Sequence, residues 1–236
     1  MMSVKLNIKR ISGKIIPFEY NYFIGSAIYH KLLLYEHEVM PLHNISQIGV
    51  YTFSNIINPI KKVSYGDNGI DIDSGYIIFR TLDDKIISYL RLAILEDPVL
   101  KIKDVDYRIT RVETLDGVTF NSDTIKFKTL SPVLVRDFIR KNLYVSKENE
   151  VPGNLKLVLE HQMAQFFGIT NPLFTLDEIK THRKTIRISN NGKKESITTG
   201  FNISGVMKTT SEIANILYYK GLGSKTSLGL GCWKVM

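Results

Sequence analysis

The order in which two spacings of apolar residues follow one another constrains the fold of this chain more than any other feature. In residues 3–11 apolar side chains alternate with polar ones, and this period of two predicts a strand with one buried face. Apolar residues in 20–35 and 84–96 recur instead at the spacing of a helix. Further strands are predicted, from β-branched and aromatic residues or an extended pattern, at 47–56, 76–80 and 99–115. The first half is therefore expected to run strand–helix–strand–strand–helix–strand.

The second half repeats this order. Its predicted elements are a strand from Thr124, a polar loop at 146–153, a helix at 154–167, a hairpin with strands at 185–189 and 196–207 around Asn190-Asn191-Gly192, a helix at 210–220 and a closing strand at 231–236. Thr209 and Glu212 have the spacing of a capping box for the last helix, and Gly221 is expected to cap its end. The repeated order predicts an α+β fold of two tandem ferredoxin-like (RRM-like, βαββαβ) domains, residues 1–118 and 119–236.

The net charge is distributed unevenly between these halves. The chain has 31 Lys and Arg and 23 Asp and Glu, a formal charge of +8. Residues 1–118 hold 14 basic and 14 acidic residues, whereas residues 119–236 hold 17 and 9, so the whole excess lies in the second half. Such an asymmetry favours an anionic partner, nucleic acid first, that contacts the second half.

Composition also excludes several classes of protein. A single cysteine, Cys232, excludes an internal disulfide and any multi-cysteine metal site. The longest stretch without formal charge, residues 40–60, is interrupted by polar residues and does not resemble a membrane span. The alternating N-terminus lacks the apolar core of a signal peptide, so we expect a cytoplasmic protein that does not bind membranes.

Residues 221–231, GLGSKTSLGLG, are the most specific motif of the chain. Four glycines in this short segment are incompatible with a helix or a packed strand. The spacing fits neither a Walker A loop nor a dinucleotide-binding fingerprint. Two interpretations remain open: backbone N–H groups that cradle a phosphate, or a segment that locks two elements together.

This segment resembles the glycine-rich signature of CRISPR-associated endoribonucleases of the RAMP superfamily, which cut CRISPR repeat RNA into guide units. The helix at 20–35 (YNYFIGSAIYHKL), YTFS at 51–54 and TLSP at 129–132 occur in the order expected for that family. The resemblance implies two tandem ferredoxin-like domains and a reaction that needs no metal and no cofactor. In that reaction the ribose 2′-OH attacks the adjacent phosphorus, leaving a 2′,3′-cyclic phosphate and a 5′-OH end.

The resemblance also implies catalytic residues in the first half. His43 matches the family's histidine between the first helix and the second strand, and Tyr29 matches a tyrosine inside that helix. An imidazole exchanges protons near neutral pH, which suits His43 to activating the 2′-OH. His30 is a third catalytic candidate, and His37 is a further alternative for the histidine. Some family members carry a lysine directly before the second strand, where this chain has Gly49. Two alternatives are open: His30, Lys61, Lys62 or the Lys225 loop meets the phosphorane instead, or the rate is modest.

The RNA-contact candidates lie in the second half. A basic ribbon is predicted around the 190–192 turn, and the polar centre of the glycine-rich segment is a second candidate. The predicted contacts are Arg183, Lys184, Arg187, Lys193, Lys194, Gly223, Ser224, Lys225 and Thr226. The expected partner is precursor and mature CRISPR RNA, with other CRISPR complex subunits as further partners and the chain itself a monomer or homodimer.

Two other functions remain open at this point. A non-catalytic RNA-binding subunit of a CRISPR ribonucleoprotein would have the same basic surface without cutting. An unrelated ferredoxin-like enzyme could use the glycine-rich segment to bind a small phosphorylated ligand.

Overall fold

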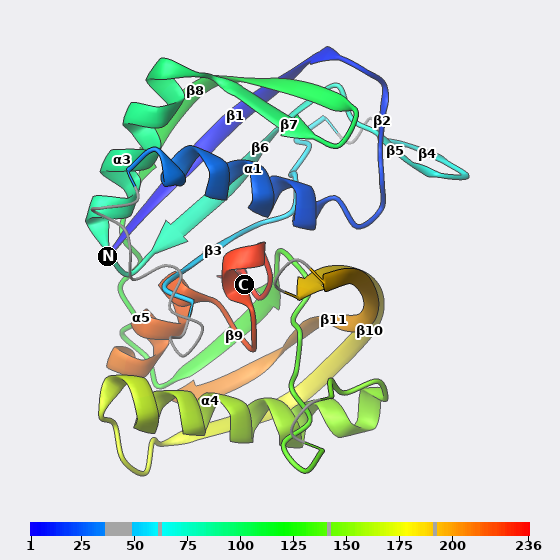
Figure 1. Ribbon diagram of the computed structural model, residues 1–236. Coiled ribbons are helices and arrows are strands. Elements are labelled where there is room, and N and C mark those ends of the chain that lie inside the picture. The colour runs from blue at the N-terminus through cyan, green and yellow to red at the C-terminus, as the bar shows by residue number, and fades with distance from the viewer. Residues whose placement is uncertain (36–48, 61–62, 141–142, 191–192) are drawn as a thin grey trace.

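The computed structural model describes residues 1–35, 49–60, 63–140, 143–190 and 193–236 (Figure 1). Its elements in the first half are β1 (Met2–Ser12), β2 (Ile15–Ile16), α1 (Asn21–Leu33), β3 (Tyr51–Phe53), β4 (Ser64–Gly66), β5 (Gly69–Asp71), β6 (Ser74–Thr81), α3 (Asp84–Glu96), β7 (Val99–Ile102) and β8 (Val105–Leu115). Those of the second half are β9 (Thr124–Thr129), η2 (Glu148–Glu150), α4 (Val151–Phe167), β10 (Phe174–Asn190), β11 (Lys193–Thr209), α5 (Ser211–Lys220), η3 (Thr226–Leu228) and β12 (Trp233–Val235).

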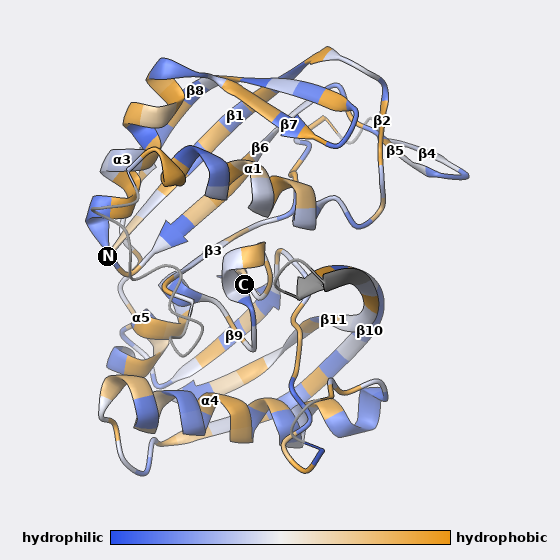
Figure 2. Ribbon diagram, in the orientation of Figure 1, coloured by the Kyte–Doolittle hydropathy of each residue, from blue (hydrophilic) through white to orange (hydrophobic). Residues whose placement is uncertain are grey.

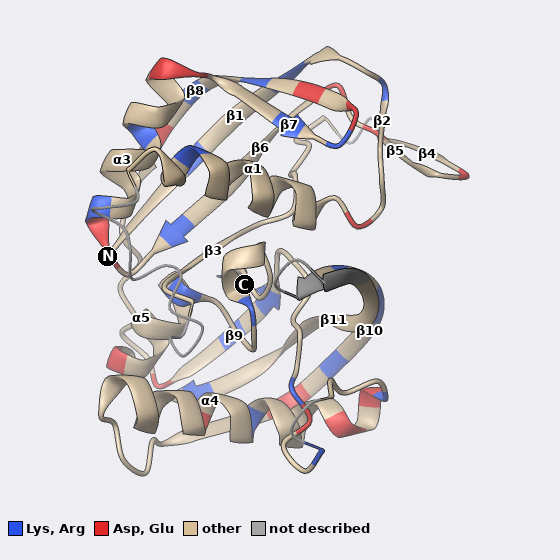
Figure 3. Ribbon diagram, in the orientation of Figure 1, with Lys and Arg blue, Asp and Glu red and all other residues tan. Residues whose placement is uncertain are grey.

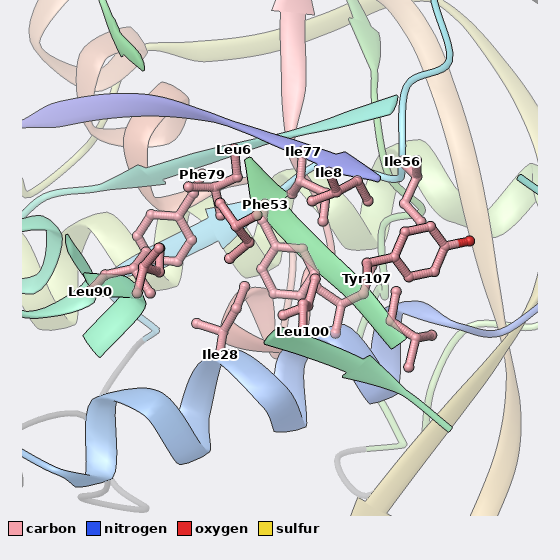
Figure 4. Close-up of a cluster of buried hydrophobic side chains, with 14 of the residues drawn as sticks. Leu6, Ile8, Ile28, Phe53, Ile56, Ile77, Phe79, Leu90, Leu100 and Tyr107 are labelled. Atoms are coloured by element: carbon pink, nitrogen blue, oxygen red, sulfur yellow. The ribbon is translucent and has the colours of Figure 1, made fainter. Parts of the chain in front are cut away.

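The first half forms a five-stranded antiparallel sheet in the order β3-β6-β1-β8-β7. Hydrophobic and hydrophilic residues alternate along β1 (Figure 2). The alternation separates two faces, as predicted from the sequence: Leu6 and Ile8 are buried, whereas Lys9 is exposed. The buried face packs against α1 and α3 in one apolar core, shown in Figure 4. Within it Tyr107 satisfies its hydroxyl by donating to the Ile72 carbonyl at 2.6 Å. A separate three-stranded sheet, β2-β5-β4, lies beside this unit.

The second half forms a four-stranded sheet in the order β10-β11-β9-β12. Its buried face, with Phe127 and Phe201, packs against α4 and α5 in a second core. Trp233 is fully buried there and donates its indole N–H to the Leu217 carbonyl at 2.9 Å. In each half the first strand in sequence, β1 or β9, lies between the third and the last main strand. The predicted elements occur in the predicted order in both halves, and the first half also contains the short strands β2, β4 and β5, which were not predicted.

Several predicted boundaries are wrong. The polar loop expected at 146–153 ends early because α4 already begins at Val151; Pro152 is tolerated in a first turn, where an N–H has no partner within the helix. The helix cap is Thr210, whose side chain accepts from the Ile213 N–H, while Thr209 donates instead to the Leu173 carbonyl. Gly221 caps the end of α5 as predicted. The ribbon strands β10 and β11 are much longer than the turn signal alone indicated.

None of the helices in the described part of the chain combines the length and the apolar character needed to cross a membrane.

Candidate functional site

The glycine-rich segment, residues 221–231, lies between the two sheets (Figure 1). All four of its glycines have positive φ, between 74° and 88°, at Gly221, Gly223, Gly229 and Gly231. Residues with a Cβ are strained in that region. A Cβ at Gly229 would also overlap the Phe53 ring, and one at Gly231 would overlap the Leu222 carbonyl. Backbone angle and close packing therefore both require glycine here.

Backbone hydrogen bonds close the segment on itself and attach it to the rest of its own unit. Leu222 donates its N–H to the Gly231 carbonyl, Gly231 to that of Pro132, and Ser224 to that of Leu134, each at 2.8 Å. These N–H groups are therefore used within the protein and do not face a ligand.

Two side chains of the first unit bind the glycine-rich segment. We call these contacts between the units the joint. Asn21 at the start of α1 donates to the Gly229 carbonyl at 2.8 Å. Thr52 in β3 donates its hydroxyl to the Leu230 carbonyl at 2.9 Å. The sequence left two interpretations of this segment open. At the two ends of the segment the glycines lock it against α1 and β3, which agrees with the second interpretation.

The polar centre of the segment divides into covered and accessible residues. Gly223 and Thr226 are buried, whereas Ser224 and Lys225 are half-buried. Burial lowers the pKa of the Lys225 amine from its usual value. Of the four contacts predicted in this segment, Ser224 and Lys225 are thus the side chains that solvent, and a ligand, can reach.

Helix α1 rests directly on this segment. A Cβ at Gly25 would lie 3.3 Å from the Leu228 Cα, so the helix backbone and η3 are in close contact. Tyr29 follows Gly25 by one helical turn and therefore lies on the same side of α1. It is half-buried, and its ring centroid is 5.9 Å from that of His30. The packing thus brings Tyr29 to the side of α1 that meets the glycine-rich segment.

Gly49 reaches the same segment from another direction. A Cβ at Gly49 would lie 2.6 Å from Thr226 Oγ1 and 3.3 Å from the Ser227 nitrogen. Thr226 therefore occupies the space that a side chain would need at position 49, where the resemblance implies a lysine in some family members. His43 and His37 belong to residues 36–48, outside the described residues, and Lys61 and Lys62 lie outside them as well.

His30 lies in a groove between α1 and β7. The groove has a volume of about 490 Å³ and is lined by Ala27, His30, Val99, Lys101 and Lys103 among others. Neighbouring Lys31 is 6% exposed and pairs with the Asp97 carboxylate at 2.8 Å, which lowers the pKa of that carboxyl group. His30 therefore lines a groove to which Tyr29 does not contribute.

The basic ribbon contains both accessible and engaged side chains. Lys184 is exposed. Arg183 is also exposed and donates to the Ser146 carbonyl. Arg187 is instead bound to Glu19 of the first unit. The side chains of Lys193 and Lys194 lie outside the described residues.

Lysines on the open face of the second sheet are not among the contacts predicted from the sequence. Lys128 of β9 has a neighbour on each adjacent strand: Ser204 of β11 on one side and Lys234 of β12 on the other. Ser204 in turn lies opposite Lys180 of β10. Lys126, two residues before Lys128 on β9, points to the same face, and all four of these lysines are exposed. Figure 3 shows Lys and Arg residues, in blue, along β9. Like charges directly opposite each other, such as Lys128 and Lys234, destabilise a sheet. A row of exposed lysines also attracts anions. The alternation in TIKFKT, residues 124–129, could have predicted that Lys126 and Lys128 share one exposed face of a strand.

Lys220 at the end of α5 lies beside the joint. It is fully buried and donates to the Gly221 carbonyl at 2.9 Å. Desolvation lowers the pKa of its amine to about 7.

Comparison with known proteins gives consistent matches along the chain. Residues 113–235 match the family described as CRISPR associated protein Cas6, C-terminal, and residues 15–113 match CRISPR-associated protein Cas6, N-terminal. A CRISPR-associated endoribonuclease, Cas6 1, from Methanocaldococcus jannaschii is 24% identical over 245 residues, covering 98% of this chain and 91% of that protein. An endoribonuclease-like protein, Cas6nc, from Pyrococcus horikoshii is 26% identical over 232 residues, covering 94% of each chain.

Solved structures give a similar result. A structure described as a RAMP protein binding different RNA substrates has a TM-score of 0.83 at 25% identity and covers 100% of both chains. A Cas6-related protein from Pyrococcus furiosus has the same TM-score and identity, with 98% of that chain covered.

Proposed function

Because the chain belongs to the Cas6 family of CRISPR-associated proteins, we propose that it is an endoribonuclease that binds CRISPR repeat RNA and cuts precursor CRISPR RNA. The observation that carries this proposal is the match along nearly the whole chain to a CRISPR-associated endoribonuclease. The packing of α1 and of Gly49 against the glycine-rich segment supports it, because the helix that carries Tyr29 and the residue that follows 36–48 both meet this segment.

We propose two tandem ferredoxin-like domains, residues 1–118 and 119–236. The sheet orders β3-β6-β1-β8 and β10-β11-β9-β12 both correspond to a split βαβ arrangement, which supports this division. The separate cores of the two halves support it as well.

The proposed reaction is attack of the ribose 2′-OH on the adjacent phosphorus. The O–P bond to the 5′-oxygen breaks, and the products are a 2′,3′-cyclic phosphate and a 5′-OH end. His43 accepts the 2′-OH proton, and Tyr29 donates a hydrogen bond or a proton to the leaving oxygen. No metal ion takes part in this scheme.

Charge on the phosphorane requires a cation near Tyr29. Gly49 contacts Thr226 and Ser227, the residues that directly follow Lys225. We therefore assign to Lys225 the role that the family lysine would have at position 49. His30 lines the groove between α1 and β7 together with Lys101 and Lys103. We assign His30 to contact with the RNA strand near the cut.

RNA affinity is proposed to come from the second half. Lys184, with Arg183, Lys193 and Lys194 of the ribbon, contacts phosphates, and so do the open-face lysines 126, 128, 180 and 234. Ser224 is a further contact beside Lys225.

The test is incubation of the full chain with repeat RNA in EDTA. We expect a product ending in a 2′,3′-cyclic phosphate, a loss of rate of about 10²-fold or more in His43→Ala, and a smaller loss in Tyr29→Phe. A single 2′-deoxy nucleotide before the scissile phosphate should block cutting completely. Full cleavage of the deoxy RNA, or cleavage that depends on added metal, would contradict the mechanism.

Thr226 leaves no space for a lysine side chain at position 49. The lack of that cation favours a second candidate function, an RNA-binding subunit that does not cut. Binding of repeat RNA with nanomolar affinity, without any cleavage by the wild-type chain, would establish that function in place of the first.

A further inference from the structure

The ribbon is attached to the helix that carries Tyr29. Arg187 of β10 donates through Nη2 and Nε to Glu19 Oε1, at 2.5 and 3.2 Å. Glu19 lies in the turn just before α1. The guanidinium also lies 5.9 Å from the centroid of the Phe23 ring in the first turn of α1. Through these contacts one side chain connects the second unit to the start of the helix.

This ion pair is largely removed from water. The side chains of Arg187 and Glu19 are 27% and 17% exposed. Burial alone would raise the pKa of Glu19, but the hydrogen bond and charge of Arg187 lower it below its usual value. A charge-assisted pair in this setting is stronger than an exposed one, and removal of one partner leaves the other charge poorly solvated.

The opposite face of the same strand is attached to the glycine-rich segment. Ile186 and Ile188 form a small buried cluster with Leu134 and Leu230. Because successive side chains of a strand point to opposite faces, β10 is held by Ile186 and Ile188 on one face and by Arg187 on the other. The ribbon thus contacts both α1, which carries Tyr29, and the glycine-rich segment, against which α1 packs.

The charge of Arg187 is already matched by Glu19, which argues against a phosphate as its partner. We propose that Arg187 is a positioning residue: it ties the RNA-binding ribbon to α1 and so holds Tyr29 in its orientation against the glycine-rich segment. This rests on the proposed function, in which Tyr29 acts at the cut and the ribbon contacts RNA. It replaces the expectation that Arg187 itself contacts RNA.

A double-mutant cycle tests this proposal. We expect Arg187→Met and Glu19→Gln each to lower the single-turnover cleavage rate about fivefold to tenfold, with the Kd for repeat RNA unchanged within twofold. The double variant should be no slower than either single variant, because both remove the same contact. Lys184→Ala is the matched ribbon control, and it should instead raise the Kd and flatten its salt dependence.

Two outcomes would overturn the proposal. One is an Arg187→Met variant that binds RNA more weakly with a flatter salt dependence while Glu19→Gln behaves as wild type, because Arg187 would then be an RNA contact. The other is an additive decrease in the rate of the double variant.

Hydrogen exchange separates failure of this proposal from failure of the proposed function. Amides of residues 21–33 should exchange faster in Arg187→Met and in Glu19→Gln than in wild type, whether or not the chain cuts RNA. Unchanged exchange in both variants would refute the attachment even in an active enzyme. An inactive wild-type chain with the expected exchange would refute the proposed function alone.

Discussion

Lys220 is fully buried although its amine is charged in water. The amine donates to one carbonyl oxygen, that of Gly221, and desolvation brings its pKa from 10.5 to about 7. The unfolded chain therefore binds this proton more tightly than the folded chain. Between about pH 7 and pH 10.5 the unfolded state holds more protons, so the free energy of unfolding rises with pH across that range.

We expect Lys220→Met to remove this dependence. The wild-type free energy of unfolding should rise relative to that of the variant by about 1.4 kcal/mol per pH unit between pH 7.5 and 9.5. The variant should also be the more stable of the two at pH 7, because no charge has to be buried. Urea unfolding at several pH values measures both quantities. Parallel pH profiles of the two proteins would contradict the expectation.

Individual residues were predicted from the sequence to different extents. Tyr29 was singled out by the resemblance to the family's first helix, and its position one helical turn after Gly25 lies on the side of α1 that meets the glycine-rich segment. The partner of Arg187 could not be predicted, because Glu19 is 168 residues away in sequence. Lys220 could not be recognised as buried either, since a lysine in the last turn of a helix is ordinarily exposed.

At the scale of elements, β9 offers a direct test of the basic sheet face. Lys126 and Lys128 are exposed, and no ion pair joins either one to an acidic side chain in the part of the chain that the structure describes. We expect Lys126→Ala/Lys128→Ala to weaken RNA binding and to reduce the slope of log Kd against log salt by about one unit for each phosphate that is no longer neutralised. The melting temperature should not change, because both side chains are exposed.

A charge-matched control is available on the helices. Lys85→Ala/Lys156→Ala removes the same charge from α3 and α4, and it should leave the salt slope as in wild type. Equal effects of the two double variants would mean that net charge, and not this sheet face, determines RNA affinity.

Elements were predicted best where local signals agree. The helix expected at 84–96 coincides with α3, Asp84–Glu96, because Asp83 caps it and Pro98 follows it. The start of α4 was missed because Pro152 and Gly153 resemble a loop in isolation. The length of β10 and β11 depends on pairing and on contacts with the first unit, which a turn signal does not contain.

At the scale of the whole molecule, Arg80 connects the two units on the side of α5. It is 2% exposed, its guanidinium carbon lies 3.6 Å from the centroid of the Tyr218 ring, and it donates to the Trp233 carbonyl. Arg80 itself belongs to β6 of the first sheet. With the glycine-rich segment, it makes the two cores depend on each other.

We expect the wild-type chain to unfold in one transition and Arg80→Leu to unfold in two. Trp233 is the single tryptophan and lies in the second core, so its fluorescence follows that unit, whereas far-UV circular dichroism follows both. The two signals should coincide in wild type and separate in the variant. Arg91→Leu is the control, because Arg91 bonds to Thr114 within the first unit. Coincident signals in Arg80→Leu would show that the other contacts between the units, the glycine-rich segment and the Arg187–Glu19 pair, couple them without Arg80.

The bonds of the glycine-rich segment join residues that are far apart along the chain. Asn21 and Gly229 are separated by 208 positions, and Thr52 and Leu230 by 178. Closing loops of that length costs chain entropy, and such contacts form late in folding. On refolding, we therefore expect each unit to collapse around its own core before the contacts of the glycine-rich segment form. The helical signal should return first, and the alignment of α1 with the segment, on which the proposed cutting depends, should return after a delay.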